Sequence, residues 1–179
     1  MLNSKVKDYL ILLGVAGTVI ALDQWTKWWV RENIEFGGSW LPDWLMWLSP
    51  YARFVHWYNS GAAFGMFQNG NLIFMALAFI VIGAILYYYP LVENEDWSLK
   101  AAMGLQLAGA TGNLLDRLQM GKVTDFISVG TFPVFNVADA SISIGVAILL
   151  LGVWLQERRA KKSNQLSENN EQLSVDSNQ

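Results

Sequence analysis

The stretch GLQLAGATGNLLD, residues 104–116, carries a small residue at every fourth position and ends in a carboxylate. Residues four apart lie above one another on an α-helix, so these positions form one face. A stripe of small side chains lets a second helix approach closely, as it does between membrane helices. Asn113 lies three residues before the final carboxylate, on nearly the same side. The stripe consists of Gly104, Ala108, Gly112 and Asp116.

Outward from this stretch, the chain contains four long apolar runs. A bilayer needs about 20 apolar residues, with about 17 as a lower limit. The runs predict spans at about 9–30, 71–89, 99–116 and 139–156. The composition agrees, because the chain is 53% hydrophobic and only 15% charged, against about 25% charged in a soluble domain. A soluble helical bundle is disfavoured, since its helices alternate polar and apolar faces.

The distribution of basic residues favours an orientation with both termini in the cytoplasm. In that orientation seven Lys and Arg residues lie inside and five lie outside. The cluster from Arg158 to Lys162, directly after the last run, contributes most to this asymmetry. The segment 31–70 is then extracytoplasmic, and the polar segment 163–179 is predicted to be a disordered cytoplasmic tail.

The extracytoplasmic segment is rich in tryptophan, which favours the headgroup region of a bilayer. Apolar residues at helical spacing between Trp40 and Leu48 predict an amphipathic helix on the membrane surface. Alternating residues in Phe54–Asn59 predict a strand, followed by a turn at Ser60 and Gly61. Val123–Val129 and Phe132–Phe135 are similar short pieces. The predicted fold is an all-α polytopic membrane protein with four transmembrane helices, a small extracytoplasmic β-sheet and an interfacial amphipathic helix.

Several function classes are excluded by composition. The chain has no cysteine and one histidine, His56, which excludes a thiol nucleophile, a Cys-ligated metal and a multi-His metal site. No GxSxG pattern of a serine hydrolase is present. The net charge of −3 comes from the tail, and no basic surface indicates nucleic acid.

Four aspartates are predicted to lie at the same side of the membrane. An ionisable residue within a span is costly and is a functional hypothesis by default. The alternating direction of the spans brings the four together in either orientation of the protein. Asn-x-x-Asp spacing occurs twice, at Asn113 with Asp116 and at Asn136 with Asp139. The four are Asp23, Asp116, Asp125 and Asp139.

Two of these carboxylates can form a catalytic pair. One carboxylate acts as base toward water while the other, protonated, acts as acid toward a carbonyl oxygen. Nearby like charges cannot both ionise easily, so one pKa rises. Spacing alone does not decide whether Asp139 pairs with Asp125 or with Asp116. Asp23 and Lys27 are four apart and are expected to form an ion pair.

Two other functions fit the same residues. Intramembrane aspartates also occur in proton- or ion-coupled transporters, but a transporter needs a path through the membrane and these acids gather at one face. A structural membrane subunit could use Asn and Asp to join helices, but would not need an acid in the outer connection.

Five motifs in order resemble lipoprotein signal peptidase, also called signal peptidase II. Together they cover roughly residues 7–157. The motifs are Asp23-Gln-Trp-Thr-Lys27, Asn59-Ser-Gly-Ala-Ala-Phe-Gly65, Gly112-Asn-Leu-Leu-Asp-Arg117, Val123-Thr-Asp-Phe126 and Phe135-Asn-Val-Ala-Asp139.

This resemblance implies an intramembrane aspartic endopeptidase in a membrane domain of residues 1–162. Its catalytic pair would be Asp125 and Asp139. The resemblance implies that other motif residues bind substrate or support the pair. These are Asp23, Lys27, Asn59, Gly61, Asn113, Asp116, Arg117 and Asn136.

The resemblance also implies the partners and the location. The substrate would be a bacterial prolipoprotein, cut just before its diacylglyceryl-modified cysteine, and membrane lipids would surround the enzyme. Globomycin-type cyclic peptides would inhibit it. We expect a monomer in the bacterial cytoplasmic (inner) membrane, with the active site at the outer face and no metal or cofactor.

Overall fold

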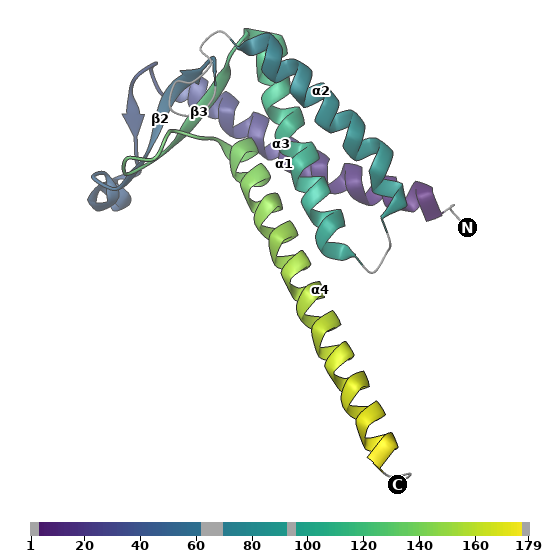
Figure 1. Ribbon diagram of the computed structural model, residues 1–179. Helices are drawn as coiled ribbons and strands as arrows, with labels where there is room; N and C mark the ends of the chain where they lie inside the picture. Colours follow the sequence, from purple (N-terminus) through teal and green to yellow (C-terminus); the bar gives the residue numbers. More distant parts are fainter. Residues whose placement is uncertain (1–3, 62–69, 93–95, 177–179) are drawn as a thin grey trace.

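The computed structural model describes residues 4–61, 70–92 and 96–176 (Figure 1). These described residues form four α-helices and one three-stranded sheet, together with two short 3₁₀ segments. The elements, in chain order, are α1 (Ser4–Asn33), β1 (Ser39–Trp40), η1 (Asp43–Leu48), β2 (Ala52–Asn59), α2 (Asn71–Tyr88), η3 (Tyr89–Leu91), α3 (Trp97–Met120), β3 (Val123–Val129) and α4 (Val137–Asp176).

Helix α3 is the centre of the fold, since it packs against α1, α2 and α4 (Figure 1). The small residues predicted to form its packing face have this role. A methyl group added at Gly104 would meet the side chain of Val15 on α1, and Ala108 is buried. Gly109, one position outside the predicted stripe, lies against the backbone carbonyl of Ala138 on α4. Close helix approach therefore uses two faces of α3.

Gly112 also leaves no room for a side chain. A Cβ atom there would lie 2.6 Å from Asp23 Oδ2 and 3.3 Å from the Cβ of Ala138. We predict that Gly112→Ala lowers the unfolding free energy by about 1–3 kcal/mol, because overpacking forces backbone shifts. Gly83→Ala on α2, where nothing lies within 4 Å, is the matched control. Thermal unfolding in detergent measures both, and equal stability of the two variants would contradict this packing argument.

The apolar core has two parts. The larger lies between α1, α2, η3 and α3 and contains Leu12, Ala16, Ile85, Tyr89, Met103, Leu107 and Ala108. The smaller joins the end of α1 to the sheet and contains Val30, Ile34 and Phe126. The second cluster fixes β3 over the end of α1, which is where the polar residues gather.

The sheet lies at the end of the helices away from the N-terminus (Figure 1). Its order is β1-β2-β3 and all pairs are antiparallel. Two of the three predicted strands are confirmed, β2 and β3, with β2 beginning two residues earlier than expected. Phe132–Phe135 is not a strand; only Phe135 forms a bridge, with Ile127. An irregularity between Phe54 and Trp57 shifts the register, so that Trp57 pairs with Asp125. Such bulges re-aim side chains near functional sites.

The predicted surface helix over residues 40–48 is confirmed only in part, as a shorter helix of a different type. Trp40 belongs to β1 and pairs with Phe54, and only Asp43–Leu48 forms a short 3₁₀ helix. Pro42 explains the difference, because a proline disfavours helical backbone at the residue before it. The two tryptophans of the 3₁₀ helix, Trp44 and Trp47, are 75% and 70% exposed, as expected of a surface segment.

The C-terminal segment also differs from expectation. Residues 163–179 were expected to be disordered on composition, whereas α4 continues to Asp176. No Gly or Pro follows Gly152, so nothing in the sequence ends the helix. In Figure 1 this part of α4 extends well beyond the other helices.

Within the described residues, two helical segments are long and apolar enough to cross a bilayer, Asn71–Leu91 and Val137–Lys161. Helices α1 and α3 contain the other two predicted spans but carry charged and amide side chains. The four of them nearest the sheet, Asp23 and Lys27 on α1 and Asn113 and Asp116 on α3, are buried. Polar groups inside a membrane protein characteristically face the interior of the bundle.

Candidate active site

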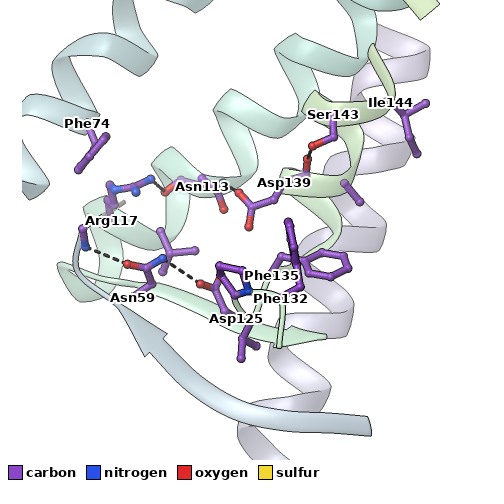
Figure 2. Close-up of a pocket in the computed structure, with 15 residues that line it drawn as sticks. Asn59, Phe74, Asn113, Arg117, Asp125, Phe132, Phe135, Asp139, Ser143 and Ile144 are labelled. Carbon is purple, nitrogen blue, oxygen red and sulfur yellow. Dashed lines mark hydrogen bonds between the residues drawn. The ribbon is translucent and has the colours of Figure 1, made fainter. Parts of the chain in front are cut away.

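A cavity of about 580 Å³ opens where the sheet meets the ends of α2, α3 and α4. Six of the ten predicted site residues contribute to its wall. They come from β2 and the turn after it, α3, β3 and α4. They are Asn59, Gly61, Asn113, Arg117, Asp125 and Asp139. Figure 2 shows the carboxylates of Asp125 and Asp139 on adjoining sides of this cavity. Apolar side chains, including Phe74, Phe132 and Phe135, form much of the remaining wall.

Asp139 is held at the start of α4 by a reciprocal pair of hydrogen bonds. Its backbone N–H donates to Asn136 Oδ1 at 2.9 Å, and its Oδ2 accepts from the backbone N–H of Asn136 at 3.2 Å. This is a capping box, which satisfies two otherwise unpaired N–H groups of the first helical turn. The Asn-x-x-Asp spacing thus both starts the helix and orients the carboxylate.

Asp125 lies on β3 and is only 2% exposed. Its two oxygens accept hydrogen bonds from different amides, Oδ1 from Asn136 Nδ2 at 2.7 Å and Oδ2 from Asn59 Nδ2 at 3.1 Å. Burial raises the pKa of Asp125 to about 7, and the charge of Asp139 acts in the same direction. The two amides oppose this rise in pKa without cancelling it. Asp125 is therefore a carboxyl that holds a proton near neutral pH.

Asn113 connects Asp139 to the interior of the bundle. Its Nδ2 donates to Asp139 Oδ1 at 2.8 Å. Its Oδ1 accepts from Lys27 Nζ at 3.0 Å and from Asn136 Nδ2 at 3.1 Å. Because each amide atom has a defined partner, the orientation of Asn113 is fixed.

Behind the cavity lies a buried charge cluster of Asp23, Lys27 and Asp116, each with 0% exposure. Lys27 Nζ is 2.9 Å from Asp23 Oδ2 and 3.4 Å from Asp116 Oδ2, so the ion pair predicted from the four-residue spacing forms. The cluster does not line the cavity. Its two carboxylates instead bind the backbone of two segments, one at the start of α4 and one in β3. Asp23 Oδ1 accepts from the N–H of Ala138 at 2.9 Å, and Asp116 Oδ2 accepts from the N–H of Thr124 at 2.9 Å. Ala138 immediately precedes Asp139, and Thr124 immediately precedes Asp125, so the cluster holds the backbone next to both aspartates of the cavity.

Arg117 extends over the opposite wall of the cavity. Its guanidinium lies 5.1 Å from the ring of Phe74, and its Nη1 donates to the carbonyl of Asn113 at 3.4 Å. Among the described residues, its buried Nε has no hydrogen-bond partner. A cationic donor in this position is suited to bind a carbonyl oxygen or a developing negative charge.

Asn59 connects β2 to the cavity. Besides donating to Asp125, it accepts from the backbone N–H of Gly61 at 2.9 Å, which forms the turn after the strand (Figure 2). The rest of the motif that begins here, residues 62–65, lies outside the described residues. Gly61 itself is buried beside the cavity.

Three further polar residues belong to this network and were not singled out from the sequence. Gln24 Nε2 lies 3.1 Å from Asp23 Oδ2, from Asp116 Oδ1 and from the carbonyl of Gly112. Thr124 and Arg31 contact each other beside Asp125. Gln24 and Thr124 fall within quoted motifs, but nothing in the local spacing indicates that they face the acids.

The described carboxylates of the site have hydrogen-bond and ionic partners within the protein. In the described part of the chain, no three His, Cys, Asp or Glu side chains cluster in a way that could hold a metal ion. The carboxylates of the cavity and of the buried cluster are engaged by amide, ammonium and backbone donors. Such an arrangement can support proton transfer between water, a substrate carbonyl and the two acids.

Comparison with known proteins gives a consistent family. Residues 15–155 match the family described as Signal peptidase (SPase) II. The lipoprotein signal peptidase of Shouchella clausii is 40% identical over 152 residues, covering 83% of this chain and 96% of that protein. The lipoprotein signal peptidase of Halalkalibacterium halodurans is 39% identical over 159 residues, covering 86% of this chain and 97% of that protein.

Solved structures agree with this result. One bacterial membrane enzyme, determined by the in meso method at 2.3 Å resolution, superposes with a TM-score of 0.75 and 27% identity. The match covers 82% of this chain and 89% of that chain. A second, determined at 1.9 Å resolution, has a TM-score of 0.70 and 28% identity, covering 80% and 92%. The fold of this chain is therefore similar to that of two bacterial membrane enzymes.

Proposed function

Since the chain belongs to the signal peptidase II family, we propose that it is an aspartic endopeptidase that removes signal peptides from bacterial prolipoproteins. The observation that carries the aspartic mechanism is the convergence of Asp125 and Asp139 on one cavity, with every carboxylate oxygen held by a donor. We propose that cleavage falls just before the diacylglyceryl-modified cysteine, as the sequence resemblance implies.

In the proposed mechanism, Asp139 is the base and Asp125 the acid. Asp139 takes a proton from a water molecule as the water oxygen attacks the scissile carbonyl carbon. Asp125 gives its proton to the carbonyl oxygen, which produces a neutral gem-diol. Asp139 then gives its proton to the amide nitrogen while Asp125 takes the proton of one gem-diol hydroxyl. The C–N bond breaks, which yields a carboxylic acid and a free amine and returns both acids to their starting protonation states. The raised pKa of Asp125 and the position of Asp139 at a helix N-terminus support this assignment.

The other polar residues have supporting roles in this proposal. Asn136, Asn113 and Asn59 orient the two acids, and Arg117 is available to bind the substrate carbonyl. Asp23, Lys27 and Asp116 fix the backbone that carries the acids. Gly61 shapes the turn beside the cavity, where the substrate backbone would pass.

We further propose that all four helices span the membrane, with residues 1–162 as the membrane domain and both termini in the cytoplasm. The burial of charged groups between α1 and α3 explains why these helices are less apolar than α2 and α4. The cavity then lies at the outer face, where water reaches the acids while the lipid chains of the substrate remain in the bilayer. This arrangement is that of a monomeric enzyme of the cytoplasmic membrane, open to globomycin-type inhibitors.

The transporter alternative has less support. Its substrate path would require ionisable or strongly polar groups along the helices. Helix α2 and residues 140–156 of α4 contain no Asp, Glu, Lys, Arg or His. The polar residues instead gather at the end of the helices near the sheet.

The proposal is tested with a mobility-shift cleavage assay in detergent. The substrates are a diacylglyceryl-modified prolipoprotein and its unlipidated precursor. We expect the protein to cleave only the lipidated form and release a product that begins with the modified cysteine, identified by mass spectrometry. Cleavage at another bond, or no cleavage by folded protein, would contradict the proposal.

The raised pKa of Asp125 predicts a pH dependence. The catalytic form carries one proton on Asp125, and that proton is lost as pH rises through about 7. We therefore expect the rate of cleavage to fall above about pH 7, approaching about tenfold per pH unit. Steady-state rates between pH 5 and pH 9 measure this, with unfolding followed in parallel. A rate that stays constant up to pH 9 would contradict the assignment of Asp125 as the acid.

A further inference from the structure

Arg31, in the last turn of α1, reaches across to the strand that carries Asp125. Its Nη1 donates to Thr124 Oγ1 at 3.1 Å and lies 3.9 Å from Asp116 Oδ1. The Arg31 side chain is 20% exposed, whereas Thr124 is completely buried. A cation at this end of α1 is also favoured by the helix dipole. Arg31 therefore makes a directed contact in the interior rather than a loose surface ion pair.

Thr124 is held from three directions. Its hydroxyl accepts from Arg31 on α1, and its backbone N–H donates to Asp116 on α3. Its carbonyl accepts from Asn136 Nδ2, at the start of α4, at 3.4 Å. Thr124 immediately precedes Asp125, so any shift of Thr124 moves the neighbouring carboxyl. Of the three contacts, only the one with Arg31 uses the threonine side chain.

We propose that Arg31 is a positioning residue for Asp125, acting through the hydroxyl of Thr124. The proposal deepens the proposed function and rests on it. Arg31 does not contribute to the cavity wall and is not part of the five family motifs. Its role is to keep β3 in the one position in which Asp125 faces Asp139.

Charge balance supports this role. The buried cluster holds two carboxylates, Asp23 and Asp116, against a single ammonium, Lys27. Arg31 supplies a second positive charge on the side of Asp116 that faces Thr124. Arginine suits this place because its guanidinium presents several donors in a fixed plane, whereas lysine presents a compact charge.

Loss of this contact should affect the chemical step more than substrate binding. Catalytic groups need placement within about 0.5 Å, and a displacement of about 1 Å can cost about 10²-fold in rate. We expect Arg31→Met and Thr124→Val each to lower kcat by about 10- to 10²-fold, with KM changed by less than about twofold. Arg31→Lys should lose part of this activity, and Thr124→Ser, which keeps the hydroxyl, should retain most of it.

The experiment measures kcat and KM for a diacylglyceryl-modified prolipoprotein, using the full-length protein in detergent. The variants are Arg31→Met, Thr124→Val and the double variant. The control is Arg53→Met, a basic residue exposed on β2 of the same sheet. If Arg31 acts through Thr124, the double variant should be no slower than the slower single variant. Thermal unfolding confirms that each protein is folded, and Thr124→Val alone carries the test if Arg31→Met does not fold.

Three results would overturn the proposal while leaving the proposed function in place. They are an Arg31→Met variant as active as Arg53→Met, a rise in KM with unchanged kcat, and losses in the two single variants that multiply in the double variant. Wild-type protein that does not cleave the lipidated substrate would overturn the proposed function and this inference together.

Discussion

Replacing either cavity aspartate by asparagine should abolish cleavage while the protein remains folded. Asp125→Asn removes the acid and Asp139→Asn removes the base, so neither variant can complete proton transfer. We expect each to reduce the rate by about 10⁴-fold, the upper range for acid–base catalysis. Asparagine matches aspartate in shape, but its Nδ2 replaces one accepting oxygen, so each variant loses one hydrogen bond from the amide network. The measurement is single-turnover cleavage of a diacylglyceryl-modified prolipoprotein.

A matched control separates catalysis from charge removal at the same side of the molecule. Asp43→Asn changes an exposed aspartate of η1, outside the cavity, and should retain wild-type activity. Full activity in both Asp125→Asn and Asp139→Asn would rule out the proposed pair.

Stability measurements sharpen the test for Asp125. Its pKa is about 7 in the folded protein and ordinary, near 3.8, in the unfolded chain. Between these two values the folded state binds more protons, so the contribution of Asp125 to stability is lost as pH rises toward 7. Asp125→Asn removes that loss. The difference in thermal stability between the variant and wild type should therefore shift in favour of the inactive variant as pH rises from 5 to about 7, and stay constant above that.

The sequence predicts the elements better than their contacts. The periodic positions of α3 identify the face that packs on α1, because helical periodicity is a local property. Alternation likewise identifies β2 and β3. Thr124 could not be identified in this way. Its partners Arg31, Asp116 and Asn136 lie 93, 8 and 12 positions away, and only the folded arrangement brings them together.

The choice between Asp116 and Asp125 as partner of Asp139 shows the same limit. Both have suitable spacing, and the family resemblance alone favours Asp125. In the structure, Asp116 lies outside the cavity wall, beside Lys27, and accepts the N–H of Thr124. Asp125 contributes to the cavity wall with Asp139. Which of the two aspartates faces the cavity depends on the register between β2 and β3 and on the packing of α1. Residue spacing does not predict either of these.

Lys27→Met should be the most destabilising single change outside the cavity. Lys27 is fully buried and is the ammonium that pairs with Asp23 and Asp116. Its removal leaves two buried carboxylates without this partner. Breaking a buried ion pair by removing one member costs about 3–5 kcal/mol. Thermal or denaturant unfolding in detergent measures the loss, and Lys7→Met, at an exposed position of α1, is the matched control.

The loss should depend on the charge left behind rather than on the missing side chain. Adding Asp23→Asn to Lys27→Met removes one of the two carboxylates, so the double variant should be more stable than Lys27→Met alone. Activity should fall with stability in Lys27→Met, since Asp23 and Asp116 fix the backbone at Ala138 and Thr124. If Lys27→Met unfolds at the same temperature as Lys7→Met, the buried cluster does not hold these two segments, and the positions of Asp125 and Asp139 must depend on the amide network alone.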